Sequence, residues 1–377
     1  MSNNNTGHQP VRFRSVDGLR GLAALGVVAY HLSGNLRPEL GELLPSWLMT
    51  GFSFGFLGVP IFFVISGFVI SYGIGAAQIH SGYVGNFILR RSVRLDLTYW
   101  ASIIMALILL ALKNRILGTN EPMPTLGDVL LNMFYLQELM NVEPTISVVY
   151  WTLCLEVQLY LFYILSLWFV QSMVRNHADG WHTGLMLLLG VYSICLDLDI
   201  TTMDMNGLFL SSWHYFLLGV LVSQAVRKTP FALSVLLAWL MIEAMFQLGW
   251  KLKANAVAGI GVTLSIYLLW RWNKMDSLLT GRVFSYLGAI SYTLYLVHPD
   301  IGWKVISLGK YVLGGALTPM MAGVLFLVGV GASIVVAHGF HMLFEKPTLA
   351  LAKRLKTHTL RQILKAFFDG LKGSRVG

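Results

Sequence analysis

The sequence predicts an all-α, polytopic integral membrane protein. Of its 377 residues, 56% are hydrophobic and 12% are charged, against about 25% charged in an ordinary soluble domain. Apolar runs of about 18 residues or more recur along the chain, which is the length that an α-helix needs to cross a bilayer. Lys and Arg gather in every second connection between these runs, as expected for cytoplasmic connections. These observations predict about ten transmembrane helices with the N- and C-termini in the cytoplasm.

Ten segments have the hydropathy of membrane spans, with boundaries uncertain by several residues. Residues 1–14 are polar and lack a signal-peptide pattern, so the first segment is expected to remain as a span. With the N-terminus inside, the cytoplasmic segments hold roughly three times as many basic residues as the outer ones. The expected spans are 18–35, 52–75, 97–117, 148–171, 183–198, 208–226, 231–249, 255–272, 284–307 and 318–344.

Two segments outside the spans carry their own patterns. The outer connection 118–147 contains an apolar stretch, Val129–Leu136, which is too short to span and predicts a re-entrant or interfacial helix. Residues 347–377 combine leucines with many Lys and Arg, which predicts an amphipathic cytoplasmic tail on anionic lipid. We therefore expect a transmembrane domain over 1–346 and a basic tail over 347–377. Nothing indicates nucleic-acid binding, because the topology explains the net charge of +9.

The first span, Ser15 to Gly34, carries two ionisable side chains. Arg20 and His31 are three helical turns apart, about 16 Å along the axis, so both lie on one face. Ionisable groups inside a membrane helix are costly and usually functional. The structural alternative is that Arg20 reaches the lipid interface while His31 makes a hydrogen-bonded helix contact. For the pair, a functional site is the better interpretation.

Three further spans bring ionisable side chains to a depth similar to that of His31. Glu156 lies about 13 Å from the outer start of its span, and His298 lies about 22 Å from the inner start of its own. His214 lies within about 10 Å of the outer face. A carboxylate beside imidazoles can orient one of them as a general base. We therefore predict His31 and Glu156 as catalytic residues.

Each of these residues also has a simpler interpretation. His298 could bond a carbonyl group that the following Pro299 frees, and His214 could be an interfacial residue beside Trp213. Glu156 has no cation near it in sequence, and an unpaired buried carboxylate favours function. A zinc site lacks the usual ligand spacing, so no metal is expected. Packing or pore lining is the expected role of the remaining intramembrane groups and cysteines, which are Glu243, His338, His341, Cys154 and Cys195.

Three arginines precede the third span in the segment FILRRSVRL. Arg91 and Arg94 have the spacing of one helix face, and Arg90 stands beside them. Ordinary positive-inside anchoring and capture of phosphate by guanidinium groups are equally good explanations of this cluster. The preceding span, Phe56–Ser71, is interrupted by Gly and Ser, which favours close helix packing over backbone contact with a ligand.

Six segments occur in a fixed order along nearly the whole chain. They are DGLRGLAALGVVAYH, GVPIFFVISGF, RRSVRLDLTYW, WTLCLE, YLGAISYTLYLVHP and FEKP. In this order they resemble the motifs of the acyltransferase type 3 family of integral-membrane O-acyltransferases, and Arg20 and His31 match the family's Arg–x10–His pair. Each motif is loose alone, but six in order form a specific signal.

The resemblance implies transfer of an acyl group, commonly acetyl from acetyl-coenzyme A, to a hydroxyl group. Implied acceptors are exported or cell-surface glycans, or small molecules. His31 would be the general base or become transiently acylated, and Glu156 would orient it or relay the proton. Arg20, Arg91 and Arg94, with Arg90 nearby, would bind the coenzyme phosphates on the cytoplasmic side. Acceptor-binding residues would be His298, Trp151 and Tyr292.

The same resemblance sets the expected partners and leaves alternatives. Partners would be acyl-coenzyme A, the acceptor and membrane lipids, with a second copy of the chain as a further candidate, in a bacterial inner membrane. Leu97 stands where the third motif usually has proline, so a bend there could differ. With no esterase-like domain after the last helix, we expect direct transfer to the acceptor or to a separate protein. A proton-coupled transporter or flippase, or a recognition scaffold without turnover, are the rival interpretations.

Overall fold

The computed structural model describes residues 13–143, 146–174, 176–202, 207–355 and 362. Helices make up 80% of it, and the described part of the chain contains no strand. This confirms the predicted all-α class. Its elements in chain order are α1 (Arg14–Gly34), α2 (Arg37–Leu43), α3 (Ser46–Ser53), η1 (Phe54–Leu57), α4 (Gly58–Ile74), α5 (Ser81–Leu117), α6 (Leu126–Met133), α7 (Tyr150–Met173), α8 (Ala178–Asp197), η2 (Phe209–Ser212), α9 (Trp213–Val226), α10 (Ala232–Gly249), α11 (Ala254–Arg271), α12 (Arg282–Val312), α13 (Pro319–Phe340), the π-helical turn η3 (His341–Glu345) and α14 (Lys346–Arg354).

Each predicted span coincides with a long helix in the described residues, and the chain is a multi-pass membrane protein. Seven helical segments of the described chain are long and apolar enough to cross a membrane. Helices α1, α8 and α12 are not among them, because polar and ionisable side chains interrupt their apolar sequence. Helices α1 and α12 carry the predicted Arg20, His31 and His298, so polarity marks helices of functional interest. Ten spans and the cytoplasmic termini stay predictions.

Helix α5 is much longer than the predicted span 97–117. It runs without interruption for 37 residues, about 55 Å, whereas the hydrocarbon core of a bilayer is about 30 Å thick. Because FILRRSVRL contains no helix breaker and position 97 is leucine rather than proline, the arginine segment continues the same helix. Thr348 on α14 donates a hydrogen bond to the Arg94 carbonyl at 3.4 Å, so α14 packs beside this part of α5.

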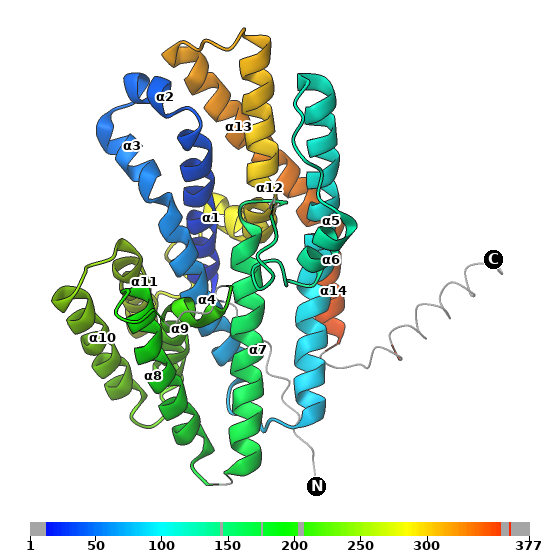
Figure 1. The fold of residues 1–377 in the computed structure, drawn as a ribbon. Coiled ribbons are helices and arrows are strands. Elements are labelled where there is room, and N and C mark those ends of the chain that lie inside the picture. The colour runs from blue at the N-terminus through cyan, green and yellow to red at the C-terminus, as the bar shows by residue number, and fades with distance from the viewer. Residues whose placement is uncertain (1–12, 144–145, 175, 203–206, 356–361, 363–377) are drawn as a thin grey trace.

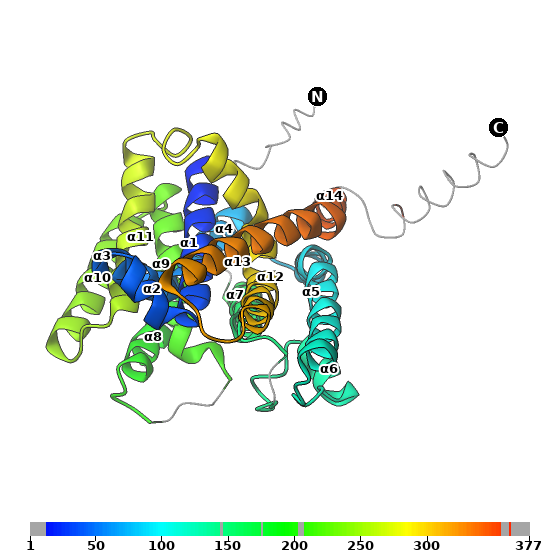
Figure 2. The same ribbon diagram turned by 90° about the horizontal axis from the view of Figure 1, so that it is seen from above.

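The helices form a central group with one cluster on either side (Figures 1 and 2). Helices α1, α4, α9 and α12 lie in the middle, and nearly every residue of α9 is buried. Helices α8, α10 and α11 stand on one side, and α5, α6 and α14 stand on the other. The pairs α1–α12, α4–α9 and α12–α13 make the most extensive contacts of the bundle.

Glycines bring two of these helix pairs into backbone contact. A Cβ atom on Gly21 of α1 would lie 2.6 Å from the backbone nitrogen of Gly288 on α12. A Cβ atom on Gly219 of α9 would lie 2.6 Å from the backbone nitrogen of Phe68 on α4. Small residues allow such close packing in membranes, where packing rather than hydrophobic burial drives helix association. The α1–α12 contact is what holds Arg20 and His31 against α12.

The Gly21 contact predicts a stability effect. Gly21→Ala should lower the free energy of unfolding by about 1–3 kcal/mol, because the added methyl group forces two backbones apart. Gly331→Ala on α13 is the matched control, since a Cβ there meets nothing within 4 Å. Thermal unfolding of both purified variants in the same detergent provides the comparison. Equal midpoints would show that α1 and α12 tolerate a wider separation.

The two segments predicted outside the spans are helical where they are described. Helix α6 begins with a capping box between Thr125 and Asp128 and is short, as predicted for the outer connection. Helix α13 continues through η3 into α14, so the predicted domain boundary at residue 346 falls within a continuous helical rod. Most of the predicted amphipathic tail, 356–361 and 363–377, lies outside the described residues.

Candidate active site

Two histidines from α1 and α12 meet at the centre of the bundle. The Nδ1 atom of His31 lies 3.0 Å from the Nε2 atom of His298. His298 is fully buried, whereas His31 is half-buried. The sequence predicted only a similar depth for these side chains, and the structure brings them into direct hydrogen-bonding contact.

The backbone of α12 determines which ring nitrogen of His298 carries the proton. Pro299 has no N–H, so the carbonyl group of Tyr295 loses its helical donor. His298 Nδ1 lies 2.9 Å from this carbonyl oxygen and 3.1 Å from that of Leu294. A carbonyl oxygen only accepts, so Nδ1 of His298 donates. The interpretation that His298 bonds a freed carbonyl is therefore correct. The same bond leaves Nε2 of His298 free to accept a hydrogen bond from His31.

This bond fixes the proton on His31 in turn. In neutral His298 the Nε2 atom is an acceptor, so Nδ1 of His31 must donate to it. His31 Nε2 then has an unprotonated lone pair. Each tautomer follows from the hydrogen-bond network. The pair is thus an orienting imidazole and an imidazole whose free nitrogen can accept a proton.

Trp303 also positions His31, and sequence reasoning missed it. Its indole Nε1 donates to the carbonyl oxygen of His31 at 3.0 Å, and its ring packs edge-on against the His31 ring at 5.8 Å. His31 lies in the last turn of α1, where carbonyl groups lack intrahelical donors. In the sequence, the one signal for Trp303 was its position five residues after the predicted site residue His298.

A cavity lies between α1, α4, α7 and α12, with about 460 Å³ of empty space when its open side is included. Arg20 and Glu156 both line it, so the structure brings these two predicted residues to one site. Ser66 on α4 donates to Glu156 Oε1 at 2.9 Å. Two tyrosines of α12, Tyr292 and Tyr295, also line it.

Tyr295 connects this cavity to the histidine pair. Its ring centroid is 6.0 Å from that of His298, and its hydroxyl group lies 2.8 Å from the Thr152 hydroxyl on α7. Thr152 also lines the cavity. Tyr295 and Thr152 therefore stand between the Arg20–Glu156 cavity and the histidines, and sequence reasoning singled out neither residue.

The structure changes the expected partner of Glu156. Glu156 was expected to orient His31, but the side chain that contacts His31 Nδ1 is His298. Glu156 instead hydrogen-bonds Ser66 in the Arg20 cavity. The imidazole–carboxylate pair inferred from similar depth is thus an imidazole–imidazole pair, because depth along a helix does not specify which neighbouring helix a side chain faces.

The two aromatic residues predicted to bind the acceptor lie in different places. Tyr292 lines the Arg20–Glu156 cavity and donates to the Leu95 carbonyl at 3.1 Å. Trp151 is 40% exposed and lines a separate pocket beneath the outer connection, together with Glu138. Partial burial, and then the nearby Glu143, raise the pKa of the Glu138 carboxyl. Trp151 and Tyr292 therefore do not face a common space.

The predicted arginine cluster includes Arg20 in the structure. Arg91 interacts electrostatically with Arg94, Glu156 and Arg20, and its guanidinium group lies over the rings of Phe87 and Tyr160. Arg94 interacts with Arg20 and with the buried Glu345 of the FEKP motif. Glu345 is also 2.8 Å from His341 Nδ1, so its charge is shared. Arg90 differs, because it donates to the Asn86 carbonyl on its own helix at 3.2 Å.

The charges of this cluster favour an anion. Three guanidinium groups face two carboxylates, and all three arginines are half-buried. Positive charge in excess at a partly desolvated site attracts phosphate, and guanidinium groups can bind it through paired hydrogen bonds. The residues Arg20, Arg91 and Arg94 are defined below as the arginine cluster.

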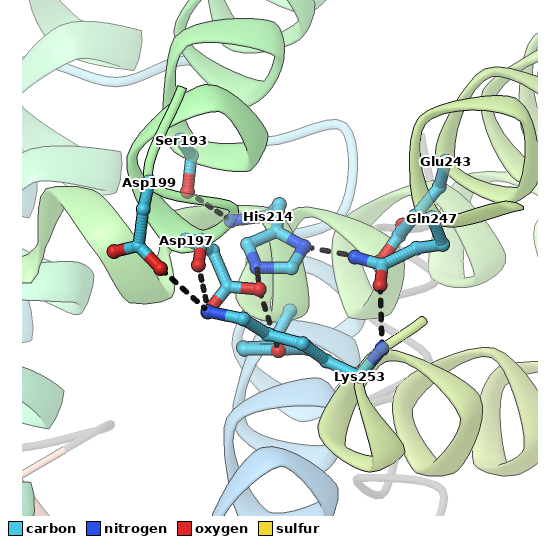
Figure 3. A network of polar contacts seen from close by, with 8 residues as sticks. Ser193, Asp197, Asp199, His214, Glu243, Gln247 and Lys253 are labelled. Atoms are coloured by element: carbon cyan, nitrogen blue, oxygen red, sulfur yellow. Dashed lines mark hydrogen bonds and ion pairs between the residues drawn. The ribbon is translucent and has the colours of Figure 1, made fainter. Parts of the chain in front are cut away.

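A second polar network occupies α8–α11 and does not include His31 (Figure 3). His214, expected at the membrane interface, is fully buried, with Nδ1 3.0 Å from Glu243 Oε1 and Nε2 3.8 Å from Asp197. Lys253 lies 3.5 Å from Asp197 and its backbone N–H donates to Gln247. The structure leaves the interfacial interpretation of His214 a prediction, and adds that its side chain is enclosed by neighbouring helices rather than exposed. The network links α8, α9, α10 and the start of α11, and we interpret its role as stabilising their packing.

The described residues contain no group of three or more His, Cys, Asp or Glu side chains that could hold a metal ion. His31, with its free ring nitrogen, and Arg20 of the arginine cluster lie toward opposite ends of one face of α1.

Residues 13–338 match the family model described as "Acyltransferase domain". Relatives include proteins named "Putative O-acetyltransferase" from Staphylococcus aureus strains COL, MSSA476 and N315. Each is 25% identical over 205 residues, which is 51% of this chain and 30% of the relative. The matched region thus spans less than a third of the length of these curated relatives. No solved structure matches the chain.

Proposed function

The chain belongs to this acyltransferase family, and from that premise we propose that it transfers an acetyl group from acetyl-coenzyme A to a hydroxyl group of an acceptor. The donor binds from the cytoplasm of a bacterium whose inner membrane holds the protein. The acceptor, a glycan or another exported molecule, approaches from the outer side. The observation that carries the proposal is the His31–His298 pair, because it leaves His31 Nε2 ready to accept a proton.

The proposed chemistry is a single acyl transfer. His31 Nε2 accepts the proton of the acceptor hydroxyl as its oxygen attacks the thioester carbonyl carbon. A C–O ester bond forms, the C–S bond breaks, and the departing thiolate receives the proton. No net proton is released. The positive charge that His31 carries in between is stabilised by its neutral neighbour, whose Nε2 atom accepts the bond from His31 Nδ1.

The arginine cluster would hold the donor. Arg20, Arg91 and Arg94 form charge-assisted hydrogen bonds with the coenzyme phosphates. Arg20 and His31 are about 16 Å apart along α1, so the pantetheine arm would carry the thioester across this distance. Glu156 limits the repulsion among the arginines, and the cavity that it lines with Arg20 provides room beside this path.

Incubating the purified protein with radiolabelled acetyl-coenzyme A and a hydroxyl-bearing acceptor tests this function. We expect coenzyme release and a labelled ester product in equal amounts. A His31→Ala sample with the same membrane extraction and chromatography profile is the control. Movement of an acceptor across proteoliposome membranes without covalent change would instead establish the transporter interpretation and contradict the proposal.

A further inference from the structure

An apolar groove runs along a different flank of α1 from the one that carries Arg20 and His31. Its walls come from α1, from the α3–η1–α4 segment and from α11, which are neighbours in the bundle (Figure 1). Its volume is about 970 Å³, including its open side. Among the described residues that line it, Ser265 has the only polar side chain, and its hydroxyl group donates to the Gly261 carbonyl at 2.8 Å. No polar side chain in the groove therefore requires a partner from a ligand.

Missing side chains create the groove. Gly51 on α3 and Gly261 on α11 are exposed lining residues, and a Cβ atom on either would meet nothing within 4 Å. Gly26 and Gly55 bring α1 and η1 together at the floor, where a Cβ on Gly26 would lie 3.7 Å from the Gly55 Cα. The α3–α4 segment and α11 are both candidate membrane spans. The groove therefore faces hydrocarbon, in which an apolar chain is its natural occupant.

One end of the groove lies next to the candidate general base. The lining residues of α1 are Leu19, Leu22, Ala23 and Gly26, which form one ridge about 10 Å long. The next position on this ridge is Tyr30. Its ring centroid is 5.1 Å from that of His31 and 5.9 Å from that of Phe56. A chain lying on the ridge thus ends within one helical turn of His31.

The geometry points to an acceptor carried on one long hydrocarbon chain, whose chain lies in this groove and whose polar head presents its hydroxyl group to His31. The inference rests on the proposed function, because it names the class of acceptor. One chain fits better than two, since α1 contributes a single ridge of lining residues to the groove. Tyr30, at the junction of apolar groove and histidine, would mark the boundary between chain and head.

Filling the groove tests this assignment by activity. Gly51→Leu combined with Gly261→Leu places side chains in the open space of the groove, and Gly331→Leu, also exposed and in open space, is the matched control on α13. Each purified protein is given the same sugar either on a polyprenyl phosphate chain or as its water-soluble methyl glycoside. We expect the double variant to lower the ratio of transfer to the chain-linked over the soluble acceptor by about tenfold or more, the loss expected from displacing two buried methylene groups. The control should keep the wild-type ratio.

A second readout needs no turnover. A polyprenyl phosphate with a photoreactive group in its chain should label peptides from α1, α3 and α11 in the wild-type protein, and unlabelled polyprenyl phosphate should compete. Equal competition by a two-chain phospholipid would mean that the groove holds bulk lipid only and would overturn the inference. An unchanged activity ratio in the double variant would overturn it as well. Specific labelling without any acyl transfer would contradict the proposed function while supporting the groove as a chain-binding site.

Discussion

Replacing His31 with alanine is expected to lower the rate of acyl transfer by about 10²- to 10⁴-fold, the usual contribution of a general base. The physical reason is the unprotonated Nε2 atom, which the hydrogen bond from Nδ1 to His298 leaves free. The loss should appear in kcat with little change in the KM for acetyl-coenzyme A, because His31 is remote from the arginine cluster. Initial rates of coenzyme release over a range of donor concentrations measure both constants.

His298 provides the discriminating control for this prediction. His298→Gln keeps an amide donor for the Tyr295 carbonyl and an acceptor for His31, whereas His298→Ala removes both. A positioning role predicts partial rescue of kcat by the glutamine relative to the alanine variant. An unchanged kcat in the His31→Ala variant would show that His31 takes no part in the acyl transfer. Wild-type kcat in His298→Ala would show that His31 needs no orienting partner.

The helices were predictable because their determinants are local. Long apolar runs locate the long helices of the bundle, and the placement of Arg20 and His31 on one face follows from the helical repeat alone. The length of α5 was not predicted, because hydropathy stops at the arginines whereas the helix does not. Polar residues can continue a helix that has left the membrane, and hydropathy does not detect this.

The contacts between helices were less predictable. Which helix face meets which neighbour depends on backbone approaches such as that of Gly21 to Gly288, and one sequence does not specify the rotation of a helix about its axis. For this reason depth alone paired Glu156 with His31, whereas packing pairs His298 with it. The same limit explains the burial of His214, whose partner Glu243 lies on a separate helix.

Replacing both Arg91 and Arg94 with alanine is expected to raise the KM for acetyl-coenzyme A by about 100-fold. A hydrogen bond to a charged group contributes about 1.5–3 kcal/mol in favourable settings, and we expect about tenfold for each of these half-buried side chains. Because the lost interactions are made equally in the ground and transition states, kcat should change little. Rates at saturating acceptor, or direct binding of labelled donor, measure the effect.

Two further variants separate phosphate binding from membrane anchoring. The double lysine variant keeps the charges but not the guanidinium forks, so phosphate binding predicts an intermediate KM. Anchoring requires only charge, so it predicts a wild-type KM for the lysine variant and reduced membrane insertion for the alanine variant. Arg271→Ala, an exposed cation at the end of α11, controls for general loss of positive charge on the predicted cytoplasmic side.

The electrostatic contacts of the arginine cluster favour phosphate binding over membrane anchoring. Anchoring arginines extend toward lipid headgroups, whereas Arg91 lies over two buried aromatic rings and interacts with Arg20 on another helix. Holding three guanidinium groups together costs repulsion that Glu156 and Glu345 only partly offset. A bound polyphosphate would remove this repulsion, so donor binding should also raise the thermal stability of the wild-type protein more than that of the double alanine variant. An equal rise in thermal stability in both proteins would indicate that Arg91 and Arg94 have a purely structural role.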